Sequence, residues 1–363
     1  ASGSNALVGL TTGSANTAMG YQSLKSMVSD SNTVGIGTNA GVNSTTSQSV
    51  IIGSQANASG VMTGDNNTYV GYASGFNSTS GDLNVGVGSN TLAGNLSGAR
   101  NIAIGANALD ANTVGSKNIA IGTDALGANV DGSRSVAVGE ATLQNQEPAS
   151  AVDMYNTAVG HAAGNQVSTG AYNTLIGGLA GDGLTTGDAN VAVGSQSLSA
   201  VCTGSNNVAV GHASLEDVTS GHENTSIGRN SGLQMTEGGE NVIVGYQAMS
   251  TDTKGHRGVA VGFNALATQN FTTATSNYNV GVGYSAGAAI TTGVQNTFVG
   301  SLAGDGTDDG ADNTAVGYSA LSANCGSYNT ATGARALSAA TGTSNTAVGC
   351  DALSSNTTGD ENT

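Results

Sequence analysis

The chain has 363 residues, of which 57 are Gly, one is Pro, none is Trp and only 4% are aromatic. Because aromatic side chains usually dominate a compact core, any core here must be thin and built from small residues. The net charge of −16 leaves no basic face for nucleic acid or for an anionic membrane surface. No apolar run of about 18 residues occurs, so membrane insertion is not predicted.

A short phrase, N-T-A-V-G or a close variant, recurs along the chain. We take its Gly as position zero; most neighbouring copies are then 17 residues apart. A fixed period of this kind determines the architecture before any local motif does. The position-zero glycines are residues 9, 20, 37, 53, 71, 88, 105, 122, 139, 160, 177, 194, 211, 228, 245, 262, 283, 300, 317, 333 and 349.

Each copy predicts one coil made of a strand, a turn and a second wall. In N-I-A-I-G at Asn101–Gly105, β-branched residues alternate with a small one, which is the period-two pattern of a strand. A G-x-x-N sequence precedes the strand, and we expect a turn there because Gly and Asn adopt positive φ most readily. The A-L or A-G pair after the position-zero Gly predicts a second extended stretch opposite the strand.

Two coils, beginning at Gly139 and Gly262, have 21 residues instead of 17. Their extra residues predict protruding loops at 143–155 and 266–278. The two loops are 123 residues apart, and so are the two copies of L-A-G-D-G. This spacing indicates that a unit of seven coils is duplicated.

These features predict an all-β fold, a β-solenoid or β-roll of about 21 coils with a 17-residue repeat. Residues 1–363 would form a single repetitive segment whose coils stack at the strand spacing of about 4.8 Å. Because open solenoid ends need caps, we expect the segment to belong to a longer fibre.

One thin solenoid of this composition is predicted to be marginally stable, because few bulky side chains per coil offset the cost of ordering the backbone. We therefore expect a homotrimer, with the chains side by side or intertwined. Small side chains allow close approach, so the small-residue face is expected to pack against the neighbouring chains. The residues of that face are Ala103, Ala120, Ala137 and Ala158.

The chain shows no catalytic, cofactor-binding or zinc motif. The four histidines lie on separate coils with no paired acid, and are predicted to be surface or turn residues: His161, His212, His222 and His256. The cysteines are too far apart for a redox or zinc motif, which predicts free thiols, with pairing between chains as the alternative: Cys202, Cys325 and Cys350. One acidic cluster is a weak calcium candidate, with a solvated turn as the alternative: Asp305, Asp308, Asp309 and Asp312.

Aromatic residues directly follow the position-zero Gly in several coils. An exposed ridge of such rings could stack on sugars, and the alternative is packing between coils or chains. The tyrosines of this candidate glycan ridge are Tyr21, Tyr72, Tyr246, Tyr284 and Tyr318. The Asn that precedes each strand predicts an amide ladder that closes the turn.

The phrases N-V-A-V-G and N-I-A-I-G, each followed by a small residue, resemble the head repeats of trimeric autotransporter adhesins, the YadA-like heads. The fuller form N-T-A-V-G-Y-x-A-L-x-x-N-x-x-G resembles repeats in the shafts of bacteriophage tail fibres. The resemblance covers nearly the whole chain. It implies a left-handed, trimeric β-roll with one phrase in each coil.

The function expected from this resemblance is a structural fibre shaft with an adhesive or receptor-binding role, as in a bacteriophage tail fibre. The alternative is a bacterial cell-surface trimeric adhesin head that binds matrix or glycans. Expected partners are two further copies of the chain, a host receptor or glycan, and other fibre or baseplate proteins. The expected location is a virion tail fibre or the cell surface.

An enzyme and an ice-binding protein fit the sequence less well. A polysaccharide depolymerase needs a pair of carboxyl groups in a groove, and the regular coils offer no such pair. Ice-binding solenoids present an unbroken Thr ladder, whereas Thr alternates with Val in this chain. No catalytic residue and no cofactor is therefore predicted.

Overall fold

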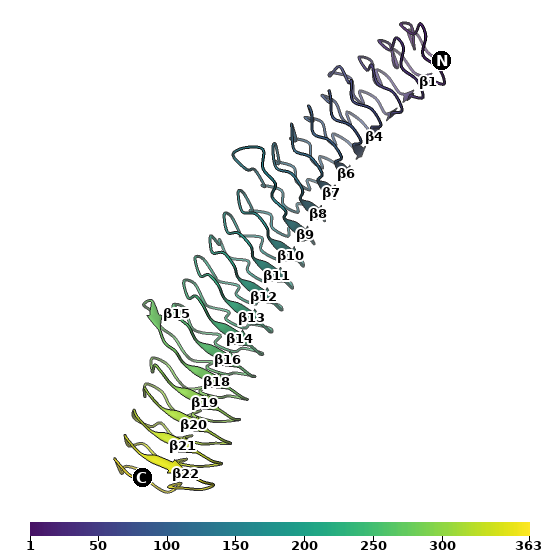
Figure 1. The fold of residues 1–363 in the computed structure, drawn as a ribbon. Coiled ribbons are helices and arrows are strands. Elements are labelled where there is room, and N and C mark those ends of the chain that lie inside the picture. The colour runs from purple at the N-terminus through teal and green to yellow at the C-terminus, as the bar shows by residue number, and fades with distance from the viewer. The chain divides into compact units, whose positions relative to one another are not determined.

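The computed structural model describes residues 1–363 and contains strands and turns but no helix. The chain divides into two compact units, Ala1–Thr186 and Gly187–Thr363. Each unit is a parallel β-solenoid, with about 20 turns in the two together (Figure 1). The predicted all-β solenoid with a 17-residue repeat is thus confirmed. That residues 1–363 act as one repetitive segment stays a prediction.

The first unit contains ten strands of three residues each, and every strand pairs in parallel with the next. The register is one full repeat, as in the pairs Ile102 with Ile119 and Ile104 with Ile121. The strands are β1 (Thr17–Met19), β2 (Val34–Ile36), β3 (Val50–Ile52), β4 (Thr68–Val70), β5 (Val85–Val87), β6 (Ile102–Ile104), β7 (Ile119–Ile121), β8 (Val136–Val138), β9 (Thr157–Val159) and β10 (Thr174–Ile176).

The second unit repeats this arrangement and adds a small second sheet. Its main strands are β11 (Val191–Val193), β12 (Val208–Val210), β13 (Thr225–Ile227), β14 (Val242–Val244), β16 (Val259–Val261), β18 (Val280–Val282), β19 (Thr297–Val299), β20 (Thr314–Val316), β21 (Thr330–Thr332) and β22 (Thr346–Val348). The small sheet pairs β15 (Gly255–His256) with β17 (Thr275–Ser276) in parallel.

The first coil is registered differently from the prediction. Ser2 forms a parallel bridge with Met19, and Gly20 N donates a hydrogen bond to Ser2 O. Gly3 has a φ of 133°, close to the values of the other position-zero glycines. The assignment of Gly9 to position zero was therefore wrong: the first step runs from Gly3 to Gly20 and has the regular 17 residues.

The turn before each strand is also built differently from the prediction. Positive φ occurs neither at the Gly nor at the Asn of G-x-x-N but at the residue before the Asn, such as Arg100 at 61° and Lys117 at 62°. Bulky residues rarely adopt this conformation. Here each donates its N–H to the previous coil, as Arg100 does to Asp82 O at 2.9 Å. The Gly is required instead for close approach, because a Cβ on Gly98 would collide with the carbonyl oxygen of Gly115.

The second wall of each coil is a run of turns and not the extended stretch that was expected. In one coil Asn107 and Leu109 both have positive φ. The wall still stacks on its neighbour, since Leu109 N donates to Ala125 O at 3.0 Å. Each regular coil therefore has one strand and one wall of stacked turns.

The predicted amide ladder is confirmed. Asn101 is buried, its Nδ2 donates to Gly115 O at 2.9 Å, and its Oδ1 accepts the backbone N–H of Asn118 at 2.9 Å. Asn84 makes the equivalent bonds one coil earlier. Buried backbone groups at the turn thus obtain partners from the Asn side chain.

The core lies between the centre of each strand and the fourth residue after the position-zero Gly. Both positions are buried, as Ala103 and Leu109 show. Where the strand centre is large the opposite position is Gly: a Cβ on Gly287 would lie 2.7 Å from a ring carbon of Phe298. This exchange keeps the interior close-packed although the side chains change from coil to coil.

The two long loops protrude, as predicted. The exposed residues at their tips are 149–153 in the first loop and 272–274 in the second. The second loop stands out beside β15 in Figure 1. It carries β17, whose Ser276 pairs with His256 of β15.

Candidate functional site

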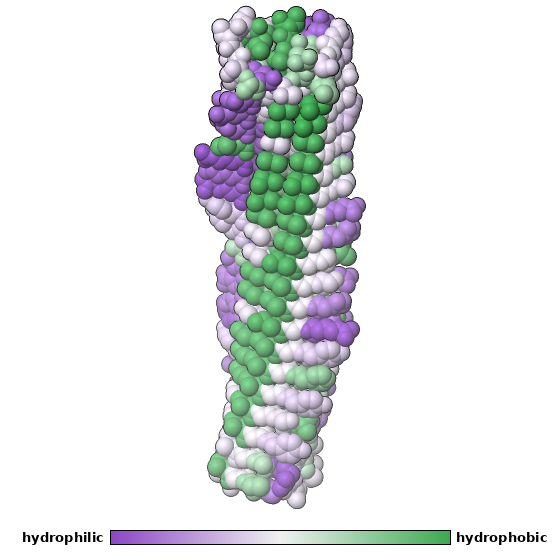
Figure 2. All heavy atoms as spheres, turned by 90° about the vertical axis from the view of Figure 1, so that its right-hand side faces the viewer, coloured by the Kyte–Doolittle hydropathy of each residue, from purple (hydrophilic) through white to green (hydrophobic).

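The strands of each unit present an apolar surface to solvent. In β6, Ala103 is buried and Ile102 is half-buried, whereas Ile104 is 39% exposed. We call the first and third residues of the main strands the apolar stripe, which appears in green in each unit (Figure 2). Its exposed members include Met19, Val87, Ile104, Ile121, Val159 and Ile176 in the first unit, and Ile227, Val242, Val299, Val316 and Val348 in the second.

This geometry corrects the prediction about the small-residue face. Ala103, Ala120, Ala137 and Ala158 are fully buried inside their own chain, where they face the opposite wall. They cannot contact a neighbouring chain. The strand pleat directs their β-branched neighbours outward instead, so any partner on this side meets Val, Ile and Thr.

The aromatic column forms a stack over only part of its length. Tyr246, Phe263 and Tyr284 lie on successive coils, with ring centroids 5.0 and 5.4 Å apart and nearly parallel planes. These rings therefore pack between coils, which was the alternative to a glycan ridge. Tyr21, Tyr72 and Tyr318 are exposed on separate coils. The proposed glycan contacts of this column stay a prediction.

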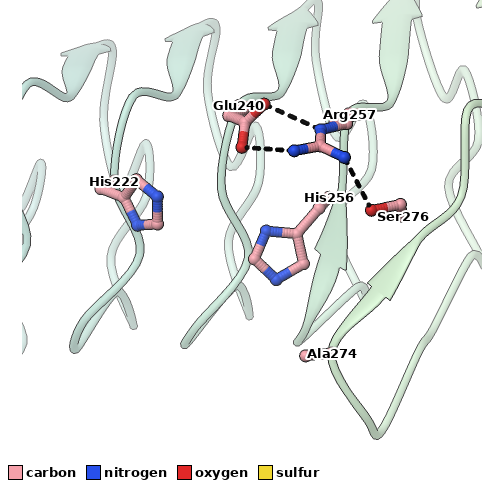
Figure 3. Close-up of a pocket in the computed structure, with 6 residues that line it drawn as sticks. All are labelled: His222, Glu240, His256, Arg257, Ala274 and Ser276. Carbon is pink, nitrogen blue, oxygen red and sulfur yellow. Dashed lines mark hydrogen bonds and ion pairs between the residues drawn. The ribbon is translucent and has the colours of Figure 1, made fainter.

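A hollow of about 290 Å³ lies beside the second long loop, and sequence reasoning missed it (Figure 3). Its lining residues are His222, Glu240, His256, Arg257, Ala274 and Ser276. His222, Gly239 and His256 occupy equivalent positions on three successive coils. The 34-residue spacing of the two histidines, which is two repeats, was the signal that could have brought them together.

An ion pair forms one side of the hollow. The carboxylate of Glu240 accepts from Arg257 Nε at 2.8 Å and from Nη2 at 3.2 Å. Arg257 Nη1 also donates to Ser276 Oγ at 3.2 Å and to the Tyr278 hydroxyl at 3.1 Å. The hydrogen bonds from Arg257 lower the pKa of Glu240 and of Tyr278. The bidentate pairing holds the carboxylate in place and ionised.

The first long loop carries a related cluster. Arg134 stands 123 residues before the arginine of the hollow, and its Nη1 donates to the Tyr155 hydroxyl at 2.7 Å. Its carboxylate partner is Asp153 of the loop itself, with Nε and Oδ1 3.0 Å apart. The duplicated units thus share an Arg–Tyr pair and differ in the acid that accompanies it.

The aspartates of the calcium candidate do not converge on one point. No group of three or more His, Cys, Asp or Glu side chains in the structure could hold a metal ion. Asp308 accepts a hydrogen bond from Thr291 Oγ1 at 2.6 Å, and Asp309 and Asp312 are exposed. Asp305 is half-buried, and its Oδ1 lies buried without a hydrogen-bond partner.

Asp182 and Asp305, the aspartates of the two L-A-G-D-G copies, share this environment. Burial raises the pKa of both, and each has a buried Oδ1 without a partner. A carboxyl group whose folded pKa lies above its unfolded pKa stabilises the fold at low pH. That contribution is lost as the pH rises through the folded pKa.

Replacing Asp182 and Asp305 by Asn should therefore stabilise the chain at pH 7 and have little effect near pH 3. We expect a gain of up to about 1 kcal/mol per site, because both side chains keep part of their solvent shell. Urea midpoints at the two pH values measure it. Asp309→Asn, at an exposed position, is the control. Equal stability of the double variant and the parent at pH 7 would contradict the expectation.

All three cysteines are free thiols within the chain. Cys202 and Cys325 are buried, and burial raises the pKa of Cys202 to about 11. Cys350 is exposed. Of the three, Cys350 alone is therefore placed to pair with another chain.

No protein-family model matches the chain, and no curated protein is significantly similar to it. The structure also lacks any long apolar helix of the kind that crosses a bilayer. Function must therefore be argued from the surfaces described above.

Proposed function

We propose that the chain is part of a homotrimeric fibre shaft with an adhesive or receptor-binding role, as in a bacteriophage tail fibre. A β-solenoid extends by adding identical coils, each of which contacts only its neighbours. Such a fold suits mechanical reach and the regular display of surface groups. The resemblance of the repeat to tail-fibre shafts and YadA-like heads supports the same role.

The apolar stripe is the observation that carries the proposal. It leaves Val and Ile side chains in solvent on many coils of each unit; Ile104 is 39% and Ile227 is 42% exposed. Continuous apolar surfaces of this kind mark interaction sites in soluble proteins. A partner that covers the stripe would remove these side chains from water and add the stability that a thin solenoid lacks.

Another copy of the chain is the partner that fits this surface best. The stripe repeats once per coil, and a second copy placed parallel and in register has the same repeat. Each coil can then make the same contact, as closed symmetric assembly requires. Three chains around one axis, the arrangement implied by the resemblance, would bury the stripe of every copy in one shared core.

Native mass spectrometry of the full chain tests this proposal directly. We expect three copies of the 35.1-kDa chain in the particle. A particle with a single copy at micromolar concentration would contradict the fibre model, and a dimer would contradict the threefold arrangement.

A further inference from the structure

We propose that the hollow between His222 and His256 binds a neutral sugar ring of a surface glycan. This inference rests on the adhesive role proposed above and specifies the site and the class of ligand. The hollow is separate from the aromatic column and from the apolar stripe, because its lining residues belong to neither.

The hollow exists because one coil lacks a side chain. Gly239 lies between the coils of His222 and His256. A Cβ on Gly239 would lie 3.2 Å from Cε1 of His222 and 3.3 Å from Nδ1 of His256. The two imidazoles therefore flank the vacant position from opposite sides, and the second long loop, with Ala274, closes the hollow at one end (Figure 3).

The groups around the hollow offer both donors and acceptors. Gly239 N donates to Nδ1 of His256 at 3.1 Å, so in the neutral ring the proton is on Nε2, which can donate. Ser276 Oγ accepts from Arg257, which leaves the Ser276 hydroxyl proton available. Each oxygen of Glu240 uses one lone pair for Arg257 and keeps another. Sugar hydroxyls, which donate and accept at once, match such a set.

The local charge favours a neutral ligand over an ion. Glu240 is paired with Arg257, and Glu237 is paired with Lys254 at 2.7 Å. The exposed Glu223 lies one coil away from Glu240 in the same column and adds a negative charge. With neutral histidines this side of the coils is slightly acidic, which disfavours sulfate or uronate. A bound metal is disfavoured because no metal-holding group of side chains forms.

The size of the hollow suits a single ring. Its volume of about 290 Å³ lies at the lower end of the range for small-molecule sites. One sugar ring, with the rest of the glycan in solvent, would occupy it. Affinity at one site would be low, and several copies in a fibre would raise the overall affinity by multivalency.

The duplicated unit supplies a comparison within the same chain. Arg257, Ala274 and Tyr278 have the same residue types 123 positions earlier, so the framework is shared. The other lining residues differ: the earlier positions hold Ala99 for His222, Lys117 for Glu240, Ser133 for His256 and Asp153 for Ser276. The polar groups assigned to the sugar are therefore particular to the second unit.

The experiment applies the fluorescently labelled full chain to a glycan array that carries neutral, sulfated and uronate-containing glycans. We expect binding to neutral glycans and a loss of at least about tenfold in the double variant H222A/H256S, because two hydrogen-bonding imidazoles are removed. This variant introduces the residue types already present at Ala99 and Ser133. Its native mass and circular dichroism should equal those of the parent. The matched control K117A/S133A in the first unit should bind like the parent.

Three outcomes would overturn the proposal: no glycan bound, a preference for sulfated or uronate glycans, or neutral binding that H222A/H256S leaves unchanged. The fibre proposal fails separately. A trimer that binds no glycan refutes the sugar site alone, whereas a single-copy particle whose neutral-glycan binding depends on the two histidines refutes the fibre alone.

Discussion

Replacing Ile104 and Ile121 by glutamate is expected to convert the assembled particle into single chains. Both side chains point out of the apolar stripe, from β6 and β7. In an assembly that covers the stripe, each substitution would bury an unpaired carboxylate. An uncompensated buried charge costs about 3–5 kcal/mol, so each site should weaken assembly by more than about a hundredfold.

Native mass spectrometry and sedimentation would detect the loss of the trimer. Leu96→Glu with Val114→Glu is the matched control, since these residues are exposed and apolar but lie in turns outside the strands. The control should stay assembled. If both double variants remain trimeric, the stripe is not the interface, and the contact between chains must be sought on another face.

Replacing Asn101 by Ala should produce the largest loss of folding stability among single substitutions at the turns. The change removes the acceptor of the Asn118 N–H and the donor to Gly115 O, and leaves both backbone groups buried without partners. An unsatisfied buried group costs about 1–3 kcal/mol, so we expect a loss of about 3 kcal/mol in the free energy of unfolding.

Urea unfolding followed by circular dichroism would measure this effect as a lower midpoint. The control is Asn77→Ala, because Asn77 is only half-buried and lies outside the ladder. The control should change the midpoint little. A similar shift for both variants would mean that the ladder contributes no more than an ordinary surface amide.

Part of the candidate site was within reach of sequence reasoning. The 17-residue period places residues 34 apart on the same side of the solenoid, two coils from each other. His222 and His256 are such a pair, and Glu240 and Arg257 are neighbours in the adjacent column. The hollow itself was not predictable, because it depends on how closely the imidazoles approach the missing side chain of Gly239 and on where the second loop lies.

The sequence alone determined the solenoid and most of its register. The period recurs without reference to any distant residue, and Gly105, with a φ of 124°, shows why its column admits no other residue: an added Cβ would lie 2.6 Å from Gly122 O. The Asn ladder followed from the same regularity, since residues one repeat apart must stack.

Only the tertiary structure decided which side of each strand faces inward. Both sides of a strand such as Ile102–Ile104 are apolar, so the alternation of residues is compatible with either direction. The opposite wall settles the choice, because Leu109 fills the interior and leaves room for Ala103 but not for a second large side chain. The larger Ile and Val are left outside, and the surface available to partners is therefore a consequence of packing across the coil.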